Sequence, residues 1–153
     1  MERLIEARKR LGFDEVFLFI MGMQYQKEKR TRQENRFVME HPEFVEDLIQ
    51  KLPYELTGAQ RRALHDVTEN MQGPYAMQRL IQGDVGSGKP ILAFLAMAWC
   101  AQNGYQSAIM APTEVLAQQH YETFQKLCEQ FGLHFPVILL TGSMTAKQKR
   151  NDV

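Results

Sequence analysis

The sequence lacks the features that define several large classes of protein. Its two cysteines, Cys100 and Cys128, are too few for a fold built on disulfides, and they fit a reducing, cytoplasmic setting. Its longest apolar run, residues 16–23, is far shorter than the roughly 20 residues of a membrane span, so no membrane partner is expected. Its 18 basic and 18 acidic residues cancel, so any attraction to nucleic acid has to be local.

Low-complexity and metal-binding patterns are missing as well. Glycine, with 10 residues, and proline, with 6, are too infrequent for a collagen-like or low-complexity chain, and the 44% of hydrophobic residues indicates a globular one. The four histidines lack the spacing of metal ligands, both among themselves and with the cysteines. We therefore expect surface or packing roles for His41, His65, His120 and His134.

The first 51 residues predict a helical arm. Residues 3–33 have a helical pattern. The first half of its segment 15–33 is apolar all round, so we expect that half to be buried. The second half, residues 26–36, is charged and has almost no apolar stripe, which is typical of a helix that crosses solvent between two bodies. A contact with nucleic acid is the alternative. A short acidic helix near residues 42–51 should dock on the next domain. We interpret residues 1–51 as a helical linker.

From residue 52 onward the pattern changes to an alternation of helices and short strands. Thr57 and Gln60 form a capping box ahead of a helix that reaches about Met71. Strands are expected at 79–82, 107–111 and 136–140, helices at 89–103 and 113–131, and an unfinished helix at 145–150. This alternation predicts an α/β fold with a parallel sheet over residues 52–153. A sheet of so few strands would have an open edge, through which the chain could self-associate.

Residues 83–90 read GDVGSGKP and match the phosphate-loop pattern GxxxxGK, followed by a helix as that pattern requires. Glycines let successive backbone N–H groups turn toward phosphate oxygens, and Lys89 adds a positive charge near the β and γ phosphates. The pattern predicts binding of ATP and makes Lys89 the candidate catalytic residue. The candidate nucleotide contacts in the loop are Gly83, Asp84, Val85, Gly86, Ser87, Gly88, Lys89 and Pro90.

Proline stands at position 90, where the phosphate-loop pattern has serine or threonine. Pro90 removes the hydroxyl that would bind Mg²⁺ and also a backbone N–H near the helix start. Each lost donor to a charged oxygen costs about 1.5 to 3 kcal/mol. Because proline is tolerated in the first turn of a helix, the loop should keep its shape but bind Mg²⁺-nucleotide weakly or not at all, and no residue is assigned to the metal.

Four segments occur in order and carry a family resemblance: LPYELTGAQ, MQRLIQGDVGSGKP, AIMAPTEVLAQQH and LLTGS. Together they resemble the first motor domain of superfamily 2 helicases, most closely the bacterial branch-migration DNA helicases. The resemblance implies a P-loop NTPase (RecA-like) domain in an ATP-dependent, Mg²⁺-using DNA helicase. It further implies branched or forked DNA as partner, and work in recombination and repair of stalled replication forks.

The same resemblance assigns roles to residues outside the loop. Gln60 is the adenine contact, or it only completes the capping box with Thr57, and both interpretations stay open. Pro112 and Thr113 would lie against the sugar-phosphate of the translocating strand, although Thr113 could simply cap an ordinary helix. A turn of hydroxyl and glycine residues would grip phosphate without reading sequence, namely Thr141, Gly142 and Ser143.

Two parts of a working motor are not found in these 153 residues. ATP hydrolysis on this fold needs a strand that ends in an Asp-Glu pair, and no acid after residue 90 follows an apolar strand. A second motor domain is also missing, so this chain alone is not expected to hydrolyse ATP or to unwind DNA. The alternatives are another P-loop NTPase or kinase, and a degenerate P-loop module that binds nucleic acid or a partner.

Overall fold

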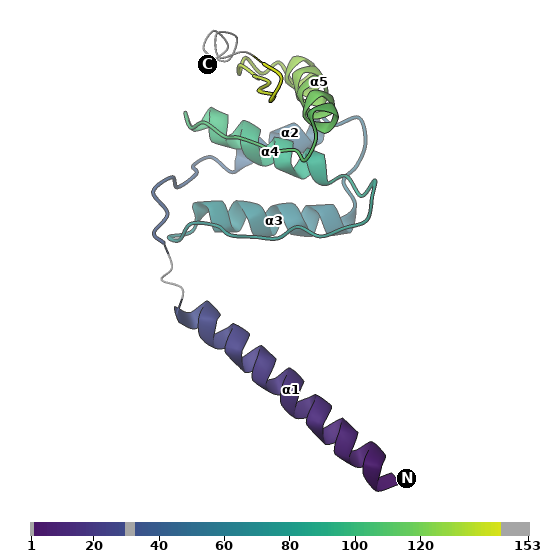
Figure 1. Cartoon of the computed structure of the whole chain (residues 1–153). Helices are drawn as coiled ribbons and strands as arrows, with labels where there is room; N and C mark the ends of the chain where they lie inside the picture. Colours follow the sequence, from purple (N-terminus) through teal and green to yellow (C-terminus); the bar gives the residue numbers. More distant parts are fainter. Residues whose placement is uncertain (1, 30–32, 145–153) are drawn as a thin grey trace. The chain divides into compact units, whose positions relative to one another are not determined.

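A computed structural model describes residues 2–29 and 33–144 of the chain (Figure 1). The chain divides into two compact units, Met1–Glu34 and Asn35–Val153. The sequence suggested a boundary between residues 51 and 52, where the motor domain is expected to begin. The two compact units do not test that boundary, which stays a prediction.

The first unit is one helix, α1, over Glu2–Lys29. Its apolar centre was expected to be buried, and that expectation is wrong: Leu18 is 69% exposed and Phe19 is 68% exposed. The reason is that the described residues of this unit form no second element for α1 to pack against, while the central apolar residues cover every side of the helix. No helix in the described parts of the chain is long and apolar enough to span a membrane.

The second unit contains four helices among its described residues: α2 (Glu43–Gln50), α3 (Gly58–Gln72), α4 (Lys89–Gln102) and α5 (Glu114–Phe131). All four lie close to the ranges that the sequence predicted. The local signals are confirmed too, since Thr57 and Gln60 form the capping box of α3, and Gly132 ends α5 in the left-handed conformation with a φ of 67°.

Helix α4 is the centre of the second unit and contacts both α2 and α3 (Figure 1). Its sequence is apolar on nearly all sides, and Leu95 and Trp99 are completely buried. The Phe94 ring packs on Phe124 and Phe131 of α5, with centroids 5.2 and 6.0 Å apart. Full burial of a large apolar side chain contributes about 1.5–3 kcal/mol, so α4 organises the core.

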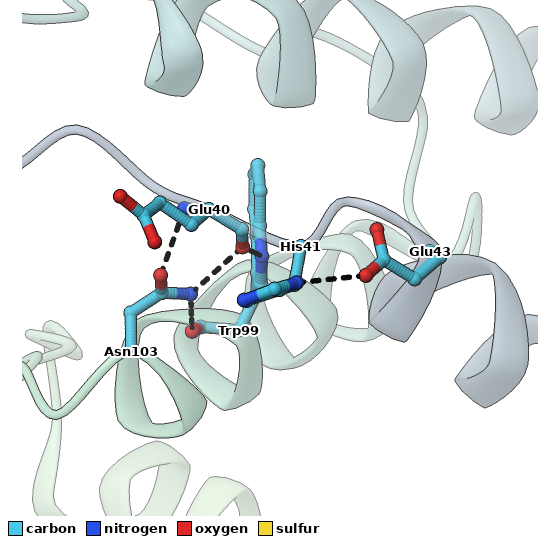
Figure 2. Close-up of polar contacts among 5 residues, drawn as sticks. All are labelled: Glu40, His41, Glu43, Trp99 and Asn103. Carbon is cyan, nitrogen blue, oxygen red and sulfur yellow. Dashed lines mark hydrogen bonds and ion pairs between the residues drawn. The ribbon is translucent and has the colours of Figure 1, made fainter.

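The acidic helix α2 docks on α4 as expected, and the residues before it form a strap, residues 35–41, that runs to the end of α4. Figure 2 shows the attachment: the indole N–H of Trp99 donates to the Glu40 carbonyl at 2.6 Å. Asn103 accepts from the Glu40 backbone N–H at 2.8 Å and donates to the Glu40 carbonyl at 3.2 Å. His41, with a φ of 59°, turns the chain into α2, and its Nδ1 lies 2.9 Å from Glu43 Oε1.

The expected parallel sheet is not formed, and the α/β fold class is therefore wrong for the described residues, which are helical. None of the segments 79–82, 107–111 and 136–140 is a strand. Leu80, Met110 and Leu140 are 86%, 96% and 52% exposed, where a sheet between helices would bury them. A strand needs backbone hydrogen bonds to a neighbouring strand, and strands that are consecutive in sequence need not be adjacent in a doubly wound sheet. The apolar runs therefore identified segments with the composition of strands, but these segments do not form hydrogen-bonded pairs with one another.

Two further expectations depended on that sheet or on its continuation. Self-association was expected through an open sheet edge. Residues 33–144 form no sheet and therefore no such edge, so that expectation loses its basis. The unfinished helix at 145–150 lies outside the described residues.

Candidate functional site

The phosphate loop, residues 83–90, connects residue 82 to the first turn of α4 and is exposed to solvent. Gly86 and Gly88 have φ angles of 80° and 77°, a conformation that other residues rarely adopt. At Gly83 the constraint is space instead, because a Cβ there would lie 2.7 Å from Ser87 Oγ. The backbone conformation therefore favours glycine at positions 86 and 88, whereas a Cβ at position 83 would need the Ser87 side chain to move.

The Lys89 ammonium group lies inside the loop. It donates to the Gly83 carbonyl at 2.6 Å, to the Asp84 carbonyl at 2.7 Å and to Ser87 Oγ at 3.3 Å. An ammonium group has three donors, and all three are directed at oxygens of the loop. The positive charge is thus held within the loop and is surrounded by loop oxygens.

Gln60 is the residue outside the loop that binds it directly. Its Nε2 donates to the Ser87 carbonyl at 2.8 Å, while its Oε1 accepts from the Thr57 backbone N–H at 2.8 Å. A Cβ on Gly88 would clash with Gln60 Nε2, so the amide in its present position lies directly against glycine. The capping role is confirmed. The contact with the loop was not foreseen, and the adenine contact stays a prediction.

Pro90 sits in the first turn of α4, where the missing N–H breaks no helical hydrogen bond. The expectation that the fold tolerates it is confirmed. Lys89 is the first helical residue although a following proline biases it away from helical geometry.

The loop suits phosphate but does not suit magnesium. Phosphate is favoured by the Lys89 charge, by the glycine backbone at positions 86 and 88, and by the N-terminal end of α4. For Mg²⁺ the loop offers no hydroxyl at position 90, and Ser87 Oγ is already in contact with the Lys89 ammonium group. These residues therefore fit the phosphates of a nucleotide and lack the usual protein ligand for its metal.

The second predicted group, at the start of α5, is tied to the turn at 141–143. Thr113 caps α5, its Oγ1 accepting from the Leu116 N–H at 3.2 Å. The next residue, Glu114, reaches across to Ser143, accepting from its N–H at 2.9 Å and from its hydroxyl at 3.2 Å. Thr141 Oγ1 lies 3.0 Å from Ser143 Oγ. The structure thus joins the two segments that the resemblance assigned to DNA.

Sequence reasoning missed Glu114. The one available signal was an acid directly after a predicted helix cap, and that position is common for ordinary electrostatic reasons. Among the described residues no hydrogen bond connects the phosphate loop with the turn at 141–143. The candidate site therefore consists of two separate groups, one around Lys89 and one around Glu114.

Other reactive side chains do not extend the site. His65, Asp66 and Glu69 lie within 4.8 Å of one another on α3, but Asp66 is paired with Arg79 at 2.7 Å and the histidine is exposed. Both cysteines are free, and burial raises the pKa of the Cys100 and Cys128 thiols. A raised thiol pKa lowers the thiolate fraction, which argues against a nucleophilic role.

Comparison with known proteins identifies the class of this chain. The sequence model of the DEAD/DEAH box helicases matches residues 57–153. The chain belongs to this family.

Within that class, the chain is similar to several proteins named RecG. The chain is 44% identical over 154 residues to the ATP-dependent DNA helicase RecG of Synechocystis sp., covering 99% of the chain and 18% of that protein. For RecG of Aquifex aeolicus the identity is 41% over 143 residues, covering 94% of the chain and 18% of the relative. For RecG of Staphylococcus aureus it is 39% over 150 residues, covering 97% and 21%.

A solved structure, described as RecG bound to a three-way DNA junction, is similar as well. The TM-score is 0.76 at 35% identity, over 97% of this chain and 20% of that one. The chain thus spans about a fifth of the length of the relatives that it matches.

Proposed function

We propose that this chain carries the nucleotide-phosphate loop of an ATP-dependent DNA helicase that acts on branched DNA. The observation that carries the proposal is the arrangement around Lys89: a glycine loop at the head of α4, a lysine ammonium held in its centre, and Gln60 bound to its rim. The DEAD/DEAH family match and the RecG relatives support the same assignment. A kinase or an unrelated P-loop enzyme does not account for this family match.

In this proposal Lys89 exchanges the loop oxygens that it now contacts for phosphate oxygens of ATP, and Gln60 faces the adenine. Pro112, Thr113, Thr141, Gly142 and Ser143 contact the DNA backbone, to which hydroxyl and N–H groups donate without reading bases. In the complete enzyme, ATP turnover would drive branch migration during recombination and repair of stalled forks. The proposal includes a cytoplasmic location, because the two free cysteines fit a reducing compartment.

A second candidate is a degenerate P-loop module that binds nucleic acid or a partner without using nucleotide. The observation that favours it is Pro90, which takes the place of the metal-binding hydroxyl and one N–H donor. In that case the loop keeps its fold for structural reasons alone.

Binding of a fluorescent ATP analogue tests the proposal. The unaltered chain should bind the analogue in EDTA, because phosphate recognition by Lys89 and the loop needs no metal. Lys89→Ala should bind at least about tenfold more weakly, since a charge-assisted hydrogen bond contributes about 1.5–3 kcal/mol. Lys126→Ala, which removes an exposed lysine from α5, is the matched control and should bind normally. Equal binding by the two variants would contradict the proposal and favour the degenerate module.

A further inference from the structure

The carboxylate of Glu114 makes two hydrogen bonds to a single residue in the turn at 141–143, which we call the hydroxyl turn. Oε1 accepts from the Ser143 backbone N–H at 2.9 Å and Oε2 accepts from the Ser143 hydroxyl at 3.2 Å. A Cβ on Gly142 would lie only 3.2 Å from Oε1, so glycine lets the carboxylate approach closely. The contact is two-pronged and is made between residues 29 apart in the sequence.

This contact orders the hydroxyl groups of the turn. Ser143 has one hydroxyl proton, and it is directed at Oε2 of Glu114. When the Ser143 proton is directed at Glu114, Ser143 Oγ accepts from the Thr141 hydroxyl, 3.0 Å away. The Ser143 hydroxyl proton is bound to the Glu114 carboxylate, whereas the Thr141 hydroxyl proton is bound only to a neutral oxygen. The Thr141 hydroxyl can therefore donate to an incoming phosphate oxygen instead of Ser143 while the rest of the turn stays fixed.

We propose that Glu114 is a positioning residue for nucleic-acid binding. It holds the hydroxyl turn against the start of α5, so that Thr113 and Thr141 present their groups to one stretch of DNA backbone. The inference rests on the proposed function, because it assumes that these segments face DNA. It goes further by assigning a role to a residue that carries the wrong charge for direct contact with phosphate.

The sign of the charge makes this role testable. If Glu114 had no role in shaping the turn, removing its negative charge would reduce repulsion of phosphate and strengthen DNA binding, most visibly at low salt. If Glu114 positions the turn, its removal frees Ser143 and weakens binding despite the gain in charge. The two explanations predict opposite changes.

Fluorescence anisotropy with a labelled forked DNA measures this change in the full chain. Glu114→Ala should weaken binding about fivefold, the effect of losing a hydrogen-bonded anchor of about 1 kcal/mol. Glu114→Gln should bind between Glu114→Ala and the unaltered chain, since its amide oxygen still accepts from the Ser143 N–H. Glu129→Ala removes the same charge from the exposed far end of α5 and should bind as tightly as the unaltered chain or slightly more tightly.

Hydrogen exchange at the Ser143 amide supplies a readout that needs no DNA. Exchange should accelerate in Glu114→Ala and not in Glu129→Ala. The inference is overturned if Glu114→Ala binds DNA as tightly as Glu129→Ala, or if Ser143 exchange is unchanged. Absence of DNA binding by the unaltered chain, with Ser143 exchange responding as expected, would instead count against the proposed function. If Glu114→Ala does not fold, Glu114→Gln gives both comparisons.

Discussion

The side-chain amide of Gln60 donates to the Ser87 carbonyl at 2.8 Å and joins the start of α3 to the phosphate loop. The other end of the same amide accepts from the Thr57 backbone N–H at 2.8 Å. Gln60 therefore serves the helix and the loop at once, and its position depends on both. A nucleotide base that binds this amide would either displace its hydrogen bond to Ser87 or bind in addition to it.

Replacing Gln60 should separate these two roles. Gln60→Glu keeps an oxygen for the Thr57 N–H but loses the donor to Ser87, so it should loosen the loop while α3 stays capped. Gln60→Ala loses both, and its free energy of unfolding should fall by about 1 kcal/mol. Urea unfolding measures the stability, and hydrogen exchange within residues 83–88 measures the loop. Slower loop exchange in Gln60→Glu, or equal stability losses in the two variants, would contradict this division.

Pro90→Thr should restore what the loop lacks for magnesium. The substitution returns one N–H and one hydroxyl at the head of α4, so the affinity for Mg²⁺-ADP should rise about tenfold or more. In EDTA the gain should be smaller, because only the restored N–H then contributes. Isothermal titration calorimetry with and without Mg²⁺ makes the comparison, and Pro136→Thr is the control for replacing an exposed proline elsewhere. Unchanged Mg²⁺-ADP affinity in Pro90→Thr would show that Pro90 is not the defect.

The helices and the phosphate loop were predictable because their determinants are local. The Thr57 and Gln60 pair lies three residues apart, and the glycine after α5 ends that helix through its own backbone conformation. The order of residues 83–90 likewise fixes which carbonyls Lys89 can reach. Signals of this range can be read in a single sequence.

The remaining features depend on partners that are distant along the chain. The segment at 107–111 is apolar enough for a strand, yet it has no paired neighbour, and a sequence pattern does not say which strands pair. The apolar centre of α1 indicated burial, but no other element among the described residues of its unit covers it. The contact between Glu114 and Ser143 spans 29 residues, and neither residue is unusual in its own surroundings.

Asn103 should stabilise the second unit through the strap at residues 35–41. Its side chain accepts from the Glu40 N–H, donates to the Glu40 carbonyl and caps the Trp99 carbonyl at 2.9 Å (Figure 2). Asn103→Ala leaves these backbone groups partly unpaired, and the free energy of unfolding should fall by about 1–2 kcal/mol. Fluorescence of Trp99, the single tryptophan, follows the unfolding directly.

Gln102→Ala is the matched control for Asn103→Ala, since residue 102 is exposed and adjacent in the chain. It should unfold like the unaltered protein. A stability loss of the same size in both variants would mean that the effect comes from the end of α4 in general. The attachment to Glu40 would then contribute little.

Glu43 should make the start of α2 sensitive to acid. The backbone N–H at the helix start, and then the His41 side chain 2.9 Å away, lower the pKa of the Glu43 carboxyl from its ordinary 4.5. For a carboxyl whose folded pKa is depressed, the stabilisation is present above pH 4.5 and is lost as the pH falls through the lowered pKa. Glu43→Gln should therefore be less stable than the unaltered chain at pH 6–7, and the difference should close in acid. Glu46→Gln removes another first-turn acid of α2 and serves as the comparison. Thermal melts from neutral pH into acid measure the stability differences. A Glu43→Gln difference that persisted in acid would refute the assignment.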